Sequence, residues 1–209
     1  VYGNGATVTV DSQSGINLYS IIDLQNPVNI TVIGLNFYDS GGNEQQTWQG
    51  ARAWNLTATG STNSGGFTII GGTYTNLVAP FVAYWTSSTT GRVQHISLNY
   101  RAVDCYLGAN FEDQGDDVTG ALTIVDSRRS YFFYGVTGHN VTLNIYHDAT
   151  TNTGGANGDI DIKRYQFDTT GDRITAFFHG NGDPYAGVPA RFEAQGNTGT
   201  FGITGLGSL

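Results

Sequence analysis

Apolar and polar residues alternate in short segments along most of this chain of 209 residues. The segment 29–37 is the clearest example. Altered copies of it follow at 66–74, 92–100, 122–126, 141–144 and 160–163. Such alternation is typical of β-strands that bury one face. No stretch of ten residues has a convincing helical period of 3.6, so the sequence predicts an all-β protein.

The copies recur at a spacing that favours a coiled, repeating architecture. Their first apolar residues lie at positions 30, 67, 93, 122, 141 and 160, at intervals of 37, 26, 29, 19 and 19 residues. A short strand repeated at a minimum of about 20 residues is typical of one rung of a β-solenoid. Apolar residues two apart in each copy then form interior columns. His95 falls in such a column beside Val93, so we expect a partly buried histidine.

Three intervals between copies are lengthened by polar insertions, at 39–65, 75–91 and 104–119. Each insertion follows the same part of its rung, so we expect all three to emerge on one side and to wall a groove. The solenoid is expected to span 1–179, and the tail 180–209 to form a cap or a transition to another domain. The chain contains no Met, even at position 1, which favours a fragment of a longer protein.

Composition argues against several classes of partner. Lys and Arg number 9 against 17 Asp and Glu, and the net charge of -8 disfavours nucleic acid, whose binding needs many cations. No apolar run approaches the roughly 20 residues of a membrane span, so no membrane partner is expected. The single cysteine, Cys105, excludes an internal disulfide. It alternates with apolar neighbours, so we expect a small buried core residue.

Two runs carry a resemblance to a known family. The run 26–37 resembles the N-x-x-N-I-T-I-x-G-L-x-F rung of right-handed parallel β-helix proteins of the pectate-lyase-like superfamily. The preceding run 3–10 resembles the G-x-G-A-T-I rung of bacteriophage tailspikes. The resemblance covers about residues 1–170 and is specific for the fold, because both motifs are structural.

The resemblance implies a right-handed single-stranded parallel β-helix that forms a homotrimer. It further implies an extracellular place on the virion tail and binding to bacterial surface polysaccharide, either capsule or O-antigen. Neither the Asp cluster that holds calcium in a pectate lyase nor an Arg-Pro-Lys-type catalytic segment is recognisable. We therefore expect no metal ion and no cofactor.

Aromatic residues in the insertions suit a sugar-binding groove, because sugar rings present apolar C–H faces to flat side chains. The candidates for substrate binding are Trp48, Tyr84, Trp85, Arg128 and Tyr131. The same aromatic residues could instead anchor the loops or fill a subunit interface. Trp54, at the edge of an insertion, is expected to be structural.

Glycoside hydrolysis requires a general acid and a second carboxylate on either side of the scissile bond. The acidic run 110–117 supplies Glu112, and we pair it with Asp104 or Asp126 from neighbouring rungs. The competing interpretation of this acidic loop is a solvated surface. Arg128 and His147 are the alternative, lyase-type set, in which a cation stabilises the enolate and a base takes the proton.

Three functions remain open from the sequence. The preferred one is a polysaccharide depolymerase of the tailspike type, by glycosidic hydrolysis in preference to β-elimination. The second is a non-catalytic receptor-binding or adhesin module that uses the same aromatic groove. The third is a purely structural solenoid segment of a larger fibre.

Overall fold

The structure is a computed structural model. It describes residues 1–12, 19–41, 50–83, 91–112, 116–127, 129–134, 141–149, 159–163, 173–180, 192–195 and 202–204. Side chains are described within 1–12, 19–41, 50–83, 91–111, 117–127 and 143–146. Within these ranges the chain is all-β and forms no helix, as the alternating pattern predicts.

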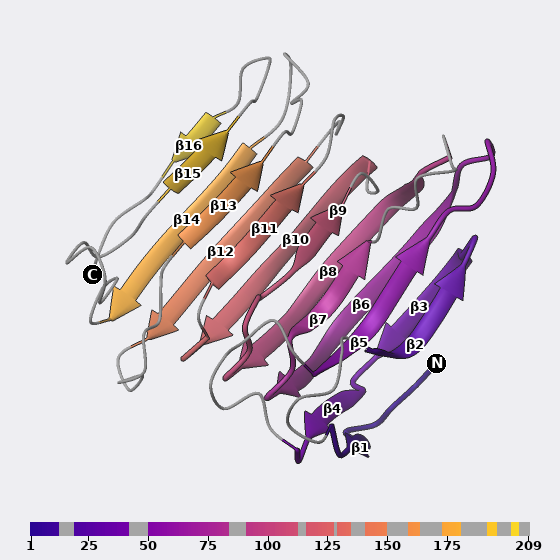
Figure 1. The fold of residues 1–209 in the computed structure, drawn as a ribbon, viewed down its shortest axis with the longest axis horizontal. Coiled ribbons are helices and arrows are strands. Elements are labelled where there is room, and N and C mark those ends of the chain that lie inside the picture. Colours follow the sequence, from indigo (N-terminus) through magenta and orange to yellow (C-terminus); the bar gives the residue numbers. More distant parts are fainter. Residues whose placement is uncertain are drawn as a thin grey trace.

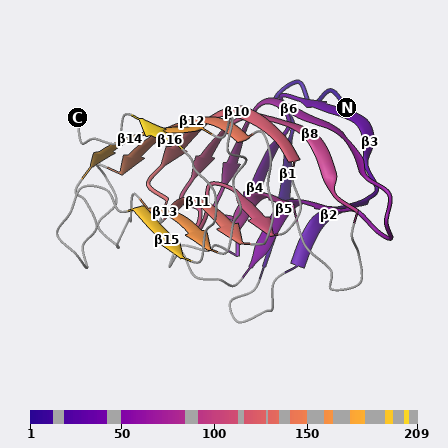
Figure 2. The same ribbon diagram turned by 90° about the horizontal axis from the view of Figure 1, so that it is seen from above.

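The described strands form two sheets, here called sheet A and sheet B. Sheet A contains β1 (Thr7–Val10), β3 (Val28–Ile33), β4 (Asn36–Asp39), β6 (Ser64–Thr75), β8 (Val93–Val103), β10 (Asp116–Val125), β12 (Val141–Ala149), β14 (Arg173–Gly180) and β16 (Gly202–Thr204). Sheet B contains β2 (Tyr19–Gln25), β5 (Ala51–Thr57), β7 (Ala79–Ala83), β9 (Asn110–Glu112), β11 (Arg129–Tyr134), β13 (Asp159–Lys163) and β15 (Phe192–Gln195). Figures 1 and 2 show the two sheets as separate layers.

β3 and β4 follow one another within sheet A, and from β4 onward the chain passes from one sheet to the other at every step. Every strand pair in the described part is parallel, and each strand of sheet A from β4 onward pairs with the next strand of the same sheet. Parallel neighbours cannot be joined by a tight hairpin, so the link between them must leave the sheet. Here that link carries a strand of sheet B. The predicted parallel stacking of repeated strands is therefore confirmed.

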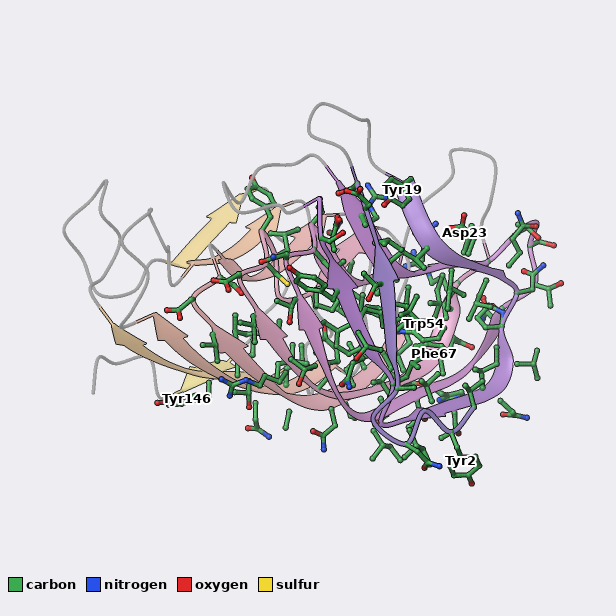
Figure 3. The ribbon with its side chains drawn as sticks, turned by 90° about the horizontal axis from the view of Figure 1, so that it is seen from below. Tyr2, Tyr19, Asp23, Trp54, Phe67 and Tyr146 are labelled. Atoms are coloured by element: carbon green, nitrogen blue, oxygen red, sulfur yellow. The ribbon has the colours of Figure 1, made fainter. Side chains whose placement is uncertain are left out.

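The core lies between the two sheets and is rich in aromatic rings. Trp54 of β5 packs against Phe67 of β6, with ring centroids 5.5 Å apart, and against Phe37 of β4 at 5.4 Å. Its indole Nε1–H donates to the Tyr74 hydroxyl at 3.1 Å. Figure 3 shows Trp54 and Phe67 inside the body of the molecule. The expectation that Trp54 is structural is confirmed.

The strand register differs from the spacing inferred from the sequence. One column of sheet A contains Ile30, Phe67, Ile96, Val118 and Val141. The sequence alignment placed Val93 and Leu122 there instead, and Ile160, which lies in sheet B. The error arises because most of each long strand alternates, so several registers fit the same pattern equally well.

The three ranges expected as polar insertions each contain a strand of sheet B. Range 39–65 includes β5, 75–91 includes β7, and 104–119 includes β9. β5 and β7 are buried on both faces almost throughout, which hides their alternation from a sequence scan. In contrast, buried and exposed residues alternate along most of β8 in sheet A. The outer face of sheet A is therefore open to solvent.

Candidate functional site

Four residues with a left-handed backbone conformation form a column near the N-terminal ends of neighbouring strands of sheet A. Asn29, His95 and Asp117 have φ angles of 52°, 55° and 52°, and Gly66 has 79°. The neighbouring residues are in register, so these four positions lie side by side on β3, β6, β8 and β10. Glycine adopts this conformation freely, and Asn, Asp and His are the other residues most often found there.

The left-handed residue reverses the alternation of the strand that contains it. Val93 and Ile96 are both buried although they are three residues apart, and His95 between them faces outward. The His95 side chain is 71% exposed. The expectation of an inward, partly buried histidine is therefore wrong, because a strict period of two does not survive a left-handed residue.

His95 and Asp117 form a pair across adjacent strands. The His95 Nδ1 lies 3.1 Å from the Asp117 Oδ2, and the Asp117 side chain is 33% exposed. A carboxylate at Nδ1 fixes the orientation of the imidazole ring. The pair can therefore present a hydrogen-bonding nitrogen to a ligand at this surface.

A surface groove with a volume of about 440 Å³ lies against this column. Its lining consists of Val28, Asn29, Asn63, Ser64, Gly65, Gly66, Gln94 and His95. A Cβ added at Gly66 would lie 2.5 Å from the Asn29 Oδ1 and 3.0 Å from the Asn29 backbone N. A Cβ added at Gly65 would collide with the backbone carbonyl of Gln94. The two glycines thus allow close strand approach.

A column of hydroxyl side chains runs two residues further along the same strands. Thr31, Thr68, Ser97 and Thr119 are in register on β3, β6, β8 and β10. All four are exposed or half-buried on the outer face of sheet A. The amides and imidazole of the groove therefore continue into a row of hydroxyl donors and acceptors.

The structure places the backbones of two of the predicted catalytic residues, Asp104 and Asp126, at adjacent positions. Asp104 and Asp126 follow β8 and β10 directly, and the last residues of these strands, Val103 and Val125, are paired. The Asp104 N–H donates to the Val125 carbonyl at 3.1 Å. Both aspartates are left-handed, with φ of 52° and 48°. Asn76, at the same corner of the preceding strand β6, has φ of 59°.

This corner gives the two aspartates a structural role. The residue after each corner turns inward: Cys105 and Ser127 are fully buried, and the Cys105 N–H donates to the Ser127 Oγ at 3.0 Å. Since Asn serves the same purpose at position 76, the left-handed turn accounts for an Asp or Asn here without any catalytic demand. Glu112, the third predicted catalytic residue, ends β9 of sheet B, and its side chain lies outside the described part.

The predicted substrate-binding residues lie largely outside the described residues. Trp48, Tyr84, Trp85 and Arg128 are all outside them. Tyr131 lies in β11, paired with Ile160 of β13, and only its backbone is described. His147, the alternative base, lies in β12 beside Ile124, also with only its backbone described. These six assignments stay predictions.

Cys105 is buried as predicted. Burial raises the pKa of its thiol to about 12, and the nearby Asp104 carboxylate adds a smaller raising effect. The Sγ lies 3.3 Å from the Val103 carbonyl. A thiol with so high a pKa is not a nucleophile at neutral pH.

The groove was missed by sequence reasoning, although the sequence carries its signal. A left-handed-tolerant residue, an apolar residue and a hydroxyl residue recur as a three-residue motif. The motif occurs at 29–31, 66–68, 95–97, 117–119 and 140–142. The first four copies form the groove column and the hydroxyl row, and Thr142 of the fifth pairs with Thr119. Two copies are Asn-x-Thr triplets, which are common by chance in a chain rich in Asn and Thr.

Fold and site together define a class: an all-β protein of two parallel sheets with a polar groove on an open sheet face. A scan against protein-family models gives no match for this chain, and searches of curated proteins and of solved structures give none either. Among the described residues, no group of three or more His, Cys, Asp or Glu side chains lies together, and no helix is long and apolar enough to cross a bilayer.

Proposed function

We propose that this chain is a right-handed parallel β-helix of the bacteriophage tailspike type that binds a bacterial surface polysaccharide. The groove beside Asn29, Gly66 and His95 is the proposed binding site. The observation that carries the proposal is the groove itself, a concave surface lined by amides, hydroxyls, glycines and one imidazole. Assembly as a homotrimer and a place on the virion tail belong to the same proposal and rest on the sequence resemblance.

The chemistry of this lining suits sugar hydroxyls. A sugar presents many neutral hydrogen-bond donors and acceptors close together. Amide and hydroxyl side chains can bond to both, because they donate and accept hydrogen bonds themselves. The His95–Asp117 pair adds an imidazole nitrogen whose ring orientation is fixed by a carboxylate 3.1 Å away. A groove of this kind binds its ligand through many modest hydrogen bonds and through apolar contacts, as ligand sites usually do.

Binding is tested with purified capsular polysaccharides and O-antigens in affinity electrophoresis and calorimetry. His95→Asn is the first variant, because Asn tolerates the left-handed backbone while the imidazole is lost. We expect a fall in affinity of about tenfold, or 1.4 kcal/mol. Gln25→Ala on the exposed end of β2, in sheet B, is the matched control and should bind normally. Equal affinity of His95→Asn and the parent would place the site elsewhere.

Cleavage of the bound polysaccharide is a second candidate function. The favouring observation is that Asp104 and Asp126 occupy the same corner of adjacent strands. Asp104→Asn, Asp126→Asn and Glu112→Gln should each leave binding intact and abolish the fall in polymer size measured by size-exclusion chromatography. New ultraviolet absorbance from an unsaturated uronate would identify β-elimination instead of hydrolysis. If the parent binds a polysaccharide and leaves its length unchanged, the function is recognition alone.

A further inference from the structure

The outer face of sheet A carries very little charge near the groove. On β3, β6, β8 and β10, the charged side chains described on this face are Arg101 and Asp117, and Asp117 is paired with His95. Two further cations lie close by: Arg92, whose backbone N–H donates to the Asn63 Oδ1 at 3.0 Å, and the Val1 ammonium, which donates to the Thr31 carbonyl at 2.7 Å. The whole chain, in contrast, has a net charge of -8. A polyanion would meet a protein of net negative charge whose few cations at the site are scattered, and a polycation would find no cluster of carboxylates among the described residues there.

An apolar row lies beside the hydroxyl row on the same face. Tyr2, Ile33 and Ile70 are neighbours in register: Tyr2 forms an isolated bridge with Ile33 of β3, and Ile33 pairs with Ile70 of β6. Tyr2 is 77% exposed and Ile70 is 46% exposed, so both present apolar surface to solvent. Figure 3 shows Tyr2 projecting from the sheet A side, opposite Tyr19 and Asp23 of β2. Beyond Ile70 the row continues as Asn99, Ala121 and Asn144.

The two rows form an amphipathic platform that crosses the strands. Successive strands are about 4.8 Å apart, so each row offers one side chain per strand at that interval. Along each strand the rows are two residues apart, with Thr31 beside Ile33 and Thr68 beside Ile70. Pyranose rings have an apolar face and a hydroxyl edge, and an aromatic or aliphatic surface packs on the former while hydroxyls bond the latter.

We propose that the site takes an uncharged polysaccharide segment whose chain runs across the strands of sheet A. The apolar row of Tyr2, Ile33 and Ile70 packs against ring faces, and the hydroxyl row of Thr31, Thr68 and Ser97 bonds ring edges. His95, held by Asp117, contacts the segment from the groove side. This inference rests on the proposed function, since it specifies the class of polysaccharide bound.

The test uses purified capsular polysaccharides and O-antigens of known structure, sorted into neutral polymers, polymers with uronate or sialate, and polymers with free amines. Binding is measured at low and at high salt. Ile70→Asp places a charge on the platform at an exposed strand position. Gln25→Asp adds the same charge at an exposed position of β2 and is the matched control. Ile70→Leu retains the apolar surface.

We expect a neutral polymer to bind with an affinity that changes less than about twofold with salt, because no ion pair forms and few counterions are released. Ile70→Asp should weaken binding about tenfold or more, while Gln25→Asp and Ile70→Leu should not. Salt-sensitive binding confined to charged polymers would overturn this inference and leave the proposed function standing. Normal binding by Ile70→Asp would overturn the platform, and no binding of any polymer by the folded parent would overturn both proposals.

Discussion

Left-handed backbone decides which residue types occupy the groove column. An L-residue in this conformation brings its Cβ close to the following carbonyl, at a cost of roughly 1–2 kcal/mol, which Asn and Asp partly offset by local hydrogen bonds. Asn29, Gly66, His95 and Asp117 are all types that tolerate it. The polar character of the groove is therefore partly a consequence of the backbone, and the 3.1 Å contact between His95 and Asp117 follows from their adjacent places in the column.

Glycine substitutions separate backbone strain from steric collision. Gly71 has φ of 69° with nothing within 4 Å of an added Cβ, so Gly71→Ala should lose only the conformational term, about 1–2 kcal/mol. Gly66→Ala adds contact with Asn29 on the paired strand β3, and this close packing resists the added methyl group by about another 1–3 kcal/mol. Urea denaturation should therefore give a lower free energy of unfolding for Gly66→Ala than for Gly71→Ala. Equal losses would show that Asn29 moves aside freely.

Strands β6, β8 and β10 end at a shared corner. Asn76, Asp104 and Asp126 turn the chain out of sheet A, and the next residue enters the core. The hydrogen bonds of the sheet continue through the corner, because the Asn76 N–H donates to the Val103 carbonyl and the Asp104 N–H to the Val125 carbonyl. The corner therefore belongs to the stacked sheet, and its residue type follows from the required turn.

Substitutions at the corner test whether conformation or charge is required. Asp104→Asn should retain stability within about 0.5 kcal/mol, because Asn fills the equivalent position 76. Asp104→Ala should lose about 1–2 kcal/mol, since Ala lacks the side chain that tolerates the left-handed turn. Midpoints of urea unfolding measure both. If Asp104→Asn loses as much stability as Asp104→Ala, the carboxylate charge is needed.

Between the sheets, the core holds ionisable groups that stay neutral. Burial raises the pKa of the Tyr74 hydroxyl, and it raises that of the Tyr100 hydroxyl well above its ordinary value. Tyr100 donates its hydroxyl to the Gly108 carbonyl at 2.6 Å, and Tyr74 accepts from Trp54. Together with Cys105, these groups bind their protons more tightly in the folded chain than in the unfolded chain.

Stability should therefore fall at alkaline pH. Below the unfolded pKa of Cys105, 9.0, all three groups are protonated in both states and the free energy of unfolding is unaffected by them. Above it, the unfolded chain releases protons that the folded chain retains up to about pH 12 for Cys105, so stability declines. Each group contributes about 1.4 kcal/mol per pH unit once the pH exceeds its own unfolded pKa, which is 9.0 for Cys105 and 10.0 for Tyr74 and Tyr100. Urea midpoints measured from about pH 8 to about pH 10 should fall, and less steeply in Cys105→Ala.

A slope unchanged in Cys105→Ala would mean that the thiol ionises in the folded chain. The tyrosines then account for the whole decline. Far-ultraviolet circular dichroism at each pH without urea serves as the control, because the comparison requires a folded starting state throughout the range.

The alternating pattern of the sequence was sufficient for the all-β class and for parallel stacking of repeated strands. The burial of Cys105 could also be predicted from its apolar neighbours, and Trp54 was correctly expected to be structural. These conclusions depend on local chemistry, since side chains two apart on a strand share one face wherever the strand is placed. The motif of Asn29, Ile30 and Thr31, repeated four more times, was equally readable but short enough to be mistaken for chance.

The register, the groove and the outward position of His95 were decided only by the tertiary structure. A single left-handed residue shifts the alternation by one, and the only local sign of that shift is the short motif that begins at such a residue. Asp104 and Asp126 were expected to approach one another, and they do, yet their corner geometry appears only when adjacent strands are stacked. The sequence determined that the chain forms strands which bury apolar residues, because alternation is a local property. The stacking determined which distant residues meet, because that depends on the length and shape of every link between them.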